Sequence, residues 1–166
     1  MPYLLDANVF ISAKNLHYGF DFCPGFWDWL HRENGNGKVL TTEKVRDELL
    51  YGDDRLAEWI RQRPPSFFVA PDAETIPNLT RVSEWVRSQG NYLPAAISDF
   101  YQAADYYLVA QALSLGYSVV THEIHDGSRK RVKIPTVCLG LDIPCLTPFE
   151  LLRRERARFV LPQEQT

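Results

Sequence analysis

YLLDANVF, residues 3–10, ends a short apolar run on an aspartate and carries an asparagine two positions later. A carboxylate at the edge of a hydrophobic core costs free energy unless it is paired, hydrogen-bonded or bound to a metal. Asp6 therefore has two explanations. It can be the N-cap of a helix, a role that suits both Asp and Asn, or a metal ligand at the carboxyl end of a strand. The rest of the chain decides between them.

The totals favour one domain with a substantial core, since the chain has 166 residues and 45% of them are hydrophobic. A net charge of -3 argues against a protein that coats nucleic acid along its whole surface, but it allows a local basic patch. The three cysteines form no CxxC pair, which is typical of reduced thiols in a cytoplasmic protein. No apolar run approaches the roughly 20 residues of a membrane span.

Apolar periodicity and breaker residues predict strands alternating with helices. The strands are expected at 2–5, 38–42, 67–70, 117–121 and 133–138, and the helices at 8–14, 24–33, 43–51, 54–62, 73–89, 101–115 and 148–156. This alternation predicts an α/β fold, a three-layer α/β/α domain over residues 1–160 with a central, mostly parallel sheet. Residues 161–166 are expected to form a loose tail. Ligands of such sheets bind at the carboxyl ends of the strands, which is where Asp6 falls.

Three further acidic residues fall near strand ends or the helices that follow them. They are Glu48 in VRDELL (45–50), Asp105 at the start of a helix, and Glu123 after the strand SVVT. Each has an ordinary reading: Glu48 as an exposed helix residue, Asp105 as a helix-start residue, and Glu123 as a solvated strand end. Together they predict an acidic pocket, whose charges repel one another unless it binds protons or divalent cations. Mg²⁺ and Mn²⁺ favour such oxygen ligands.

Four blocks, in this order, give the chain its family resemblance. They are YLLDANVFI (3–11), VRDELL (45–50), AADYYLVAQALSLGYSVVTHE (103–123) and KIPTVCLGLDI (133–143). With these blocks the chain resembles the PIN-domain nucleases, and more narrowly a bacterial PIN-like family related to the VapC toxins. The resemblance implies a PIN-like domain that cleaves RNA phosphodiester bonds with Mg²⁺ or Mn²⁺. It also implies a toxin role, an antitoxin partner, a homodimer, and single-stranded or structured RNA as substrate, with transfer RNA among the candidates.

The resemblance also implies roles for individual residues. Asp6, Glu48 and Asp105 match metal-binding, catalytic carboxylates, and Glu123 occupies the place of the fourth. Asn8 and Thr121 would support them through hydrogen bonds. The chain departs from the family at that fourth position, where PIN nucleases usually carry Asp. Either the longer Glu123 or Asp126 in the next loop would then serve the second metal.

That departure motivates an alternative function, a catalytically weak PIN-like module that binds nucleic acid or regulates. A phosphatase of the haloacid-dehalogenase type is a more distant alternative, because its general acid would stand where Asn8 stands. A zinc site would use His122 and His125, although their spacing is not that of a zinc motif. These histidines are otherwise expected at the rim of the pocket.

Basic residues gather in SRKRVK, residues 128–133, directly after Glu123. Arg129, Lys130 and Arg131 are the candidate phosphate contacts, with a solvated loop as the other reading. The second basic run, RRERAR at 153–158, is read as the solvated face of the last helix. Tyr106 and Tyr107 could stack an unpaired base, although adjacent helix residues point in different directions and one of them is expected in the core.

Overall fold

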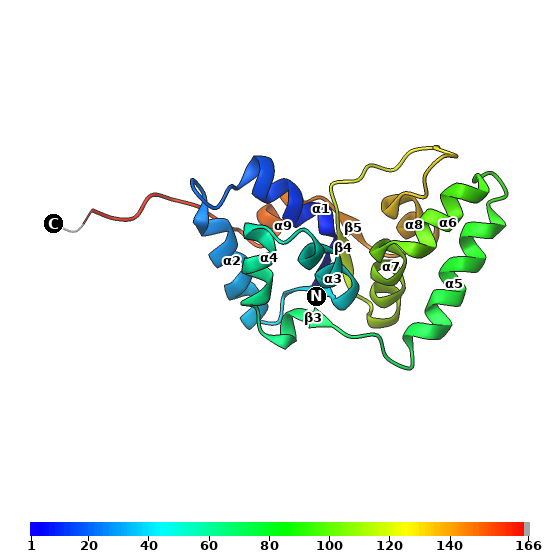
Figure 1. Cartoon of the computed structure of the whole chain (residues 1–166), viewed down its shortest axis with the longest axis horizontal. Coiled ribbons are helices and arrows are strands. Elements are labelled where there is room, and N and C mark those ends of the chain that lie inside the picture. Colours follow the sequence, from blue (N-terminus) through cyan, green and yellow to red (C-terminus); the bar gives the residue numbers. More distant parts are fainter. Residues whose placement is uncertain (165–166) are drawn as a thin grey trace.

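A computed structural model describes residues 1–164, in which a five-stranded sheet lies between two groups of helices (Figure 1). The strand order is β3-β2-β1-β4-β5, and every pairing is parallel, so the predicted α/β fold is confirmed and the sheet is entirely parallel. The strands are short: β1 (Tyr3–Leu5), β2 (Val39–Thr42), β3 (Phe68–Val69), β4 (Ser118–Val120) and β5 (Cys145–Leu146). β1 is central, and its neighbours β2 and β4 bring their carboxyl ends to the same edge as Asp6.

Helices connect the strands and cover both faces of the sheet. They are α1 (Ala7–Ser12), α2 (Pro24–Gly35), α3 (Glu43–Tyr51), α4 (Arg55–Arg61), α5 (Thr75–Ser88), α6 (Pro94–Gln102), α7 (Ala104–Leu115), α8 (Ile134–Gly140) and α9 (Pro148–Arg154). A π-helical turn, η1 (Ala13–His17), extends α1, and a 3-10 turn, η2 (Pro65–Phe67), precedes β3. In Figure 1, α1, α2, α4 and α9 gather on one side of the sheet and α5 to α8 on the other.

Each face of the sheet has its own hydrophobic core. Leu5 and Val120 pack with buried side chains of α1, α2, α3, α4 and α9. Leu4 and Val119, one residue earlier on the same two strands, pack with α5, α6, α7 and α8. Side chains alternate between the two faces of a strand, so a strand buried on both faces is apolar throughout. This is why the first strand reads as an uninterrupted apolar run.

Side-chain caps fix where three of the helices begin. The side chains of Thr42, Asp54 and Thr147 each accept a hydrogen bond from a backbone amide three residues later. Such a cap satisfies an amide that has no partner inside the helix. The helices expected from residues 43, 54 and 148 therefore begin at or beside capped positions. The cap at Thr42 starts α3 directly at the carboxyl end of β2, which carries Glu48 toward the same edge as Asp6.

The predicted strand over 133–138 is wrong, because these residues form the start of helix α8. Pro135 stands in the first helical turn, where its missing amide proton is no loss. The buried residues Ile134, Val137 and Cys138 have the i, i+3, i+4 spacing of a helix. The fifth strand is instead the two-residue β5, which the sequence analysis did not predict.

The helix predicted over 101–115 is divided in the structure. α6 ends at Gln102, Ala103 has an extended backbone, and α7 begins at Ala104. The break places Asp105 in the first turn of α7, where a carboxylate is favoured by the helix dipole. Two smaller differences concern helix ends: α2 continues two residues beyond the predicted 24–33, to Gly35, and α5 begins at Thr75 instead of residue 73.

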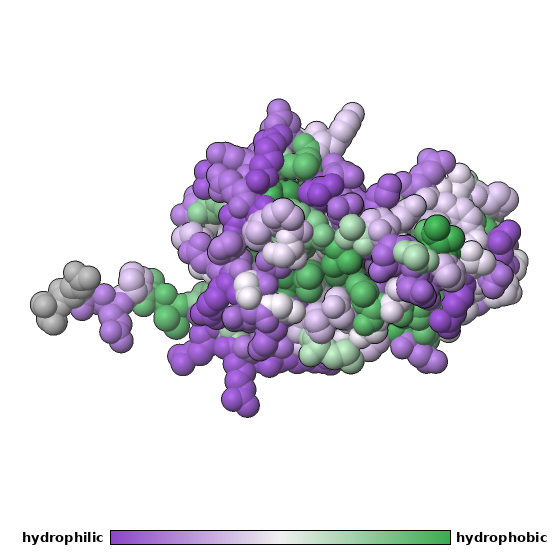
Figure 2. Space-filling model, turned by 90° about the horizontal axis from the view of Figure 1, so that it is seen from below, coloured by the Kyte–Doolittle hydropathy of each residue, from purple (hydrophilic) through white to green (hydrophobic). Residues whose placement is uncertain are grey.

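The segment after α9 has no helix or strand over residues 157–164. Phe159 still packs against Tyr18 and Phe26, and the end of the segment projects from the body (Figure 1). The loose tail expected at 161–166 stays a prediction, and residues 165–166 lie outside the described part. Figure 2 shows apolar residues on this projecting segment and across the middle of the face in view. In the part of the chain that the structure describes, no helix is long and apolar enough to cross a membrane.

Candidate functional site

The site begins where β1 and β4 end side by side. The backbone amide of Asp6 donates to the carbonyl of Val120 at 2.9 Å, which continues the sheet pairing by one residue. The Thr121 hydroxyl then donates to Oδ2 of Asp6 at 2.8 Å. Both side chains are buried, with 4% of Asp6 and 1% of Thr121 exposed. Asp6 and Thr121 therefore meet at the carboxyl edge of the sheet, while the supporting role expected of Thr121 stays a prediction.

Asp6 stands at the N-cap position of α1, yet its side chain makes no capping bond to the first turn. The Asp54 side chain, by contrast, accepts from the amide of Ala57 and caps α4. Capping therefore does not account for the Asp6 carboxylate, which turns instead toward Thr121. Of the two explanations for Asp6, the structure does not support the helix cap, and the metal ligand stays a prediction.

Asn8, in the first turn of α1, forms hydrogen bonds with the segment that follows β4. Its amide nitrogen donates to Thr121 Oγ1 at 3.3 Å, and its Oδ1 accepts from the backbone amide of His122 at 3.1 Å. The Thr121 hydroxyl also accepts from the amide of Glu123, so it joins β1, α1 and the segment after β4. Asn8 is thus occupied by positioning contacts, and an amide in this place offers no acid for the phosphatase reading.

Neighbouring acidic side chains help to raise the pKa values of Asp6 and Asp105. Burial raises the pKa of Asp6 to about 8, and the Asp105 carboxylate adds to the rise. Burial also raises the pKa of Asp105 to about 6, with further increases from Glu123 and Glu48, while the Arg131 cation opposes them. Burial raises the pKa of Glu48 as well. Asp105 is therefore the centre of a group of four carboxyl side chains whose negative charges are mutually unfavourable.

Open clefts flank Asp105. One, of about 370 Å³, is lined by Asp105 together with Lys130 and Arg131. Another, of about 450 Å³, is lined by Glu48 and by Lys44 and Tyr107. The Lys44 ammonium lies 4.8 Å from the centre of the Tyr107 ring. Asp105 and Glu48 thus each line an open cleft that also contains a cation.

The two adjacent tyrosines have different surroundings. The Tyr106 hydroxyl donates to the backbone carbonyl of Leu79 on α5 at 2.7 Å. Tyr106 therefore packs between helices, away from the cleft that Tyr107 lines. Tyr107 remains available to a ligand, as expected of one residue of the pair.

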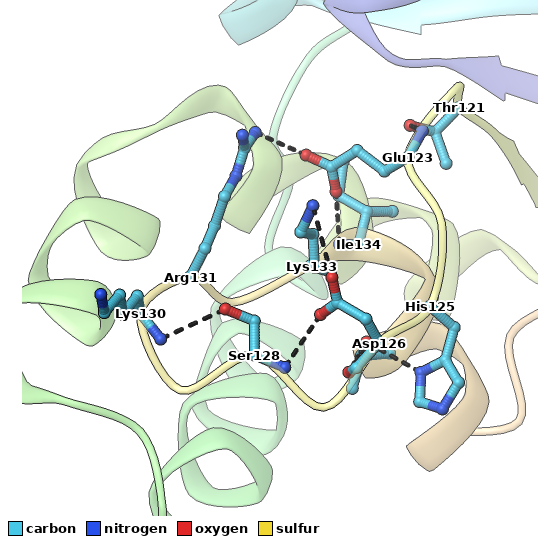
Figure 3. Close-up of polar contacts among 10 residues, drawn as sticks. Thr121, Glu123, His125, Asp126, Ser128, Lys130, Arg131, Lys133 and Ile134 are labelled. Carbon is cyan, nitrogen blue, oxygen red and sulfur yellow. Dashed lines mark hydrogen bonds and ion pairs between the residues drawn. The ribbon is translucent and has the colours of Figure 1, made fainter.

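Glu123 is held by the chain itself. Oε1 accepts from the Arg131 guanidinium at 2.6 Å and Oε2 from the backbone amide of Ile134 at 2.7 Å (Figure 3). Only 7% of its side chain is exposed. Asp126, the suggested substitute, accepts from the amide of Ser128 and pairs with Lys133. No comparison or contact tests whether either residue binds a metal, so the assignment of Glu123 as a ligand stays a prediction.

The three basic residues of the loop have separate surroundings. Arg131 pairs with Glu123, Lys130 lines the cleft beside Asp105, and the Arg129 side chain donates to the carbonyl of Asn91 at 2.9 Å. The loop is therefore fastened both to the acidic group and to the segment between α5 and α6. Lys130 is the one of the three whose side chain takes part in no ion pair or hydrogen bond within residues 1–164.

The two histidines beside Glu123 face different partners. His125 Nδ1 lies 2.9 Å from the Thr136 hydroxyl, whereas the His122 ring stacks on that of His17 with centroids 5.3 Å apart. Phe149 packs edge-on against both rings of the stack. These contacts do not support a zinc site shared by His122 and His125. His17 and Phe149 had no signal in the sequence, because neither lies in a motif.

The acidic side chains of the site supply the donor atoms that a metal ion would need. Across residues 1–164, no three His, Cys, Asp or Glu side chains converge into a formed metal site. The chemistry of the group nevertheless suits Mg²⁺ or Mn²⁺, because every donor is an oxygen and a divalent cation would relieve the repulsion centred on Asp105. Asp6, Glu48 and Asp105 are the residues that could hold it after side-chain rotation.

Comparisons with known proteins agree with this architecture. Residues 3–159 match the sequence model of a family described as a domain of unknown function, DUF4411. Among solved structures, VapBC2 from Rickettsia felis, crystallised with a DNA fragment from its promoter, is similar with a TM-score of 0.55 and 14% identity. FitAcB from Neisseria gonorrhoeae is similar with a TM-score of 0.57 and 18% identity. Each likeness covers 89% of this chain and 98% of the other. No curated protein sequence matches the chain. The resemblance in the sequence is thereby confirmed at the level of the fold, which is PIN-like and similar to the folds in VapBC2 and FitAcB.

Proposed function

Because the chain belongs to the DUF4411 family and has a PIN-like, VapC-related fold, we propose that it is an endoribonuclease dependent on Mg²⁺ or Mn²⁺. The observation that carries the proposal is the Asp6 carboxylate. It is buried at the carboxyl end of the central strand, is not used as a helix cap, and lies close to Asp105. A buried carboxylate with a carboxylate neighbour and no cation of its own is suited to a divalent ion.

Different residues of the chain have different roles in the proposed reaction. Asp6, Glu48 and Asp105 would hold the ion, and Thr121 and Asn8 orient Asp6 through their hydrogen bonds. A bound Mg²⁺ or Mn²⁺ supplies Lewis-acid chemistry, activating water and stabilising the leaving oxygen of a phosphodiester. Lys130, beside Asp105, would contact a phosphate at the entrance of its cleft.

A toxin role and a protein partner follow from the same likeness. The similarity to VapBC2 and FitAcB supports a toxin that is paired with an antitoxin. A homodimer is also proposed, and exposed apolar residues at the end of the chain favour a protein contact. Val160 is 71% and Leu161 is 90% exposed, beside a cavity of about 570 Å³. The three free cysteines are in keeping with a cytoplasmic location.

A second candidate function is a PIN-like module that binds nucleic acid with little catalysis. The observation in its favour is Glu123, whose two oxygens are both occupied by hydrogen bonds. The side chain at the fourth acidic position is therefore not free to bind a second metal in this conformation.

Cleavage of a labelled mixed RNA pool tests the first candidate against the second. The purified protein is compared in Mn²⁺, Mg²⁺ and EDTA with Asp6→Asn and Glu48→Gln, and with Asp47→Asn as the matched control on α3. Metal-dependent cleavage that is lost in the first two variants and kept in the control supports the nuclease. RNA binding by a folded protein that cleaves in neither metal would overturn it and favour the binding module.

A further inference from the structure

Both oxygens of the Glu123 carboxylate are used to hold a loop. The first accepts from the Arg131 guanidinium at 2.6 Å and the second from the backbone amide of Ile134 at 2.7 Å. The carboxylate is almost fully enclosed, with 7% of the side chain exposed, whereas Arg131 is 62% exposed. An enclosed carboxylate with a charged donor and an amide donor is well satisfied, and its hydrogen bonds are of the stronger, charge-assisted kind.

The segment between these contacts has no helix or strand, yet it carries most of the positive charge near the site. Residues 124–133, here called the basic loop, begin after Glu123, which lies three residues beyond the end of β4, and run to Ile134, the first residue of α8. The Glu123 carboxylate therefore joins the two ends of the basic loop, as Figure 3 shows. A loop whose ends are joined has fewer conformations to lose when it becomes ordered.

Further hydrogen bonds lie within the basic loop and between it and the neighbouring segment. Asp126 accepts from the amide of Ser128 at 2.9 Å, and the Ser128 hydroxyl accepts from the amide of Lys130 at 3.3 Å. The Arg129 carbonyl accepts from the amide of Leu93 at 3.0 Å. These bonds are local or exposed, and each contributes about 1 kcal/mol or less in such a setting. Arg129 also ties the loop to the segment between α5 and α6, and Val132 is buried in the core, so Glu123 is one anchor among several and the one that joins the two ends of the loop.

The length of the side chain explains why glutamate occurs here. An aspartate on the same backbone would be one methylene shorter and would not reach Arg131 and Ile134 together. The closure also holds the Arg131 cation beside Asp105, so that the acidic group has a positive charge at its edge. We propose that Glu123 is a positioning residue that closes the basic loop and holds its cations beside Asp105, rather than a metal ligand. This inference rests on the proposed nuclease function for its catalytic consequence, but not for the structure of the loop.

Limited proteolysis measures the loop without any metal. Trypsin cleaves after Arg129, Lys130, Arg131 and Lys133, which all lie in the basic loop. In EDTA, we expect Glu123→Ala and Glu123→Asp to be cut in this loop roughly tenfold faster than the wild type, the factor that one lost charge-assisted bond of about 1.4 kcal/mol gives. Arg131→Gln should also be cut faster at the remaining sites. Glu84→Ala, at an exposed position of α5, is the control and should match the wild type.

Calorimetric titration with Mn²⁺ and steady-state kinetics separate positioning from ligation. We expect Glu123→Ala to keep its Mn²⁺ affinity within about threefold, and Asp105→Asn to lose at least about tenfold, as is usual when a ligand or its support is removed. With RNA, Glu123→Ala should raise KM more than it lowers kcat. Unchanged proteolysis of both Glu123 variants, or a tenfold loss of Mn²⁺ affinity in Glu123→Ala, would overturn the inference. If Glu123→Ala does not fold, Arg131→Gln decides, because it leaves the carboxylate in place. Failure of the nuclease proposal would show separately, as a wild type that neither binds Mn²⁺ nor cleaves RNA.

Discussion

Thr121 Oγ1 donates a 2.8 Å hydrogen bond to Oδ2 of Asp6, although the two residues are 115 positions apart in the chain. The contact exists because β1 and β4 are neighbours in the sheet and end together. Thr121 also accepts from the Asn8 side chain and from the Glu123 amide, so one hydroxyl orders three segments of the site. The consequences of this junction can be measured directly.

Replacing Thr121 with valine keeps the shape of the side chain and removes the hydroxyl. We expect the free energy of unfolding to fall by about 1–3 kcal/mol, since buried polar partners on Asp6, Asn8 and Glu123 lose their hydrogen bonds. Urea unfolding in EDTA gives the value. Thr80→Val, at an exposed position of α5, should change it by less than about 0.5 kcal/mol. Equal effects of the two substitutions would mean that the junction does not stabilise the fold.

The stability of the metal-free protein should fall as the pH rises. Burial and Asp105 raise the pKa of Asp6 from 3.8 to about 8, so between these values the folded protein binds more protons than the unfolded chain. Stability therefore decreases with increasing pH across this window, by an amount on the order of a few kcal/mol. Urea unfolding at pH 5, 7 and 9 in EDTA should show the decrease in the wild type and a smaller one in Asp6→Asn. Asp47→Asn, an exposed substitution, should keep the wild-type slope. Parallel curves for Asp6→Asn and the wild type would contradict the raised pKa.

Gly140 packs against an aromatic ring and leaves no room for a side chain. A Cβ at this position in α8 would overlap the indole of Trp85 on α5. We expect Gly140→Ala to lower the free energy of unfolding by about 1–3 kcal/mol, as overpacking does. Gly35→Ala is the matched control, because a Cβ at the end of α2 meets nothing within 4 Å. The double variant Gly140→Ala, Trp85→Phe should recover part of the loss, and purely additive effects would argue against a direct clash.

The sequence predicted the parts of the site that depend on strand order and local caps. Asp6 and Thr121 each follow a predicted apolar strand, and the structure places both at the ends of those strands. The strand predicted at 133–138 is wrong because Ile134, Val137 and Cys138 have the spacing of one helix face, and a short apolar run alone does not distinguish a strand from a helix. Without α8 in place, no pattern could show that Glu123 reaches Ile134 across a loop. Such contacts depend on the path of the backbone, which local periodicity does not specify.

The stacking of His17 on His122 is another contact between distant segments that local periodicity does not specify. It leads to a further prediction. The rings lie 5.3 Å apart at an angle of 29°. Burial, and then the nearby His17, lower the pKa of His122 below its usual value. His17→Phe keeps an aromatic ring against His122 but removes the ionisable group. The pKa of His122 should therefore rise in this variant, because only the repulsion between two imidazolium charges is lost. NMR titration of the His122 ring measures the change, with His31→Gln, on the exposed side of α2, as the control that leaves it unaltered. An unchanged value in His17→Phe would mean that burial alone depresses the pKa of His122 and that the two rings titrate independently.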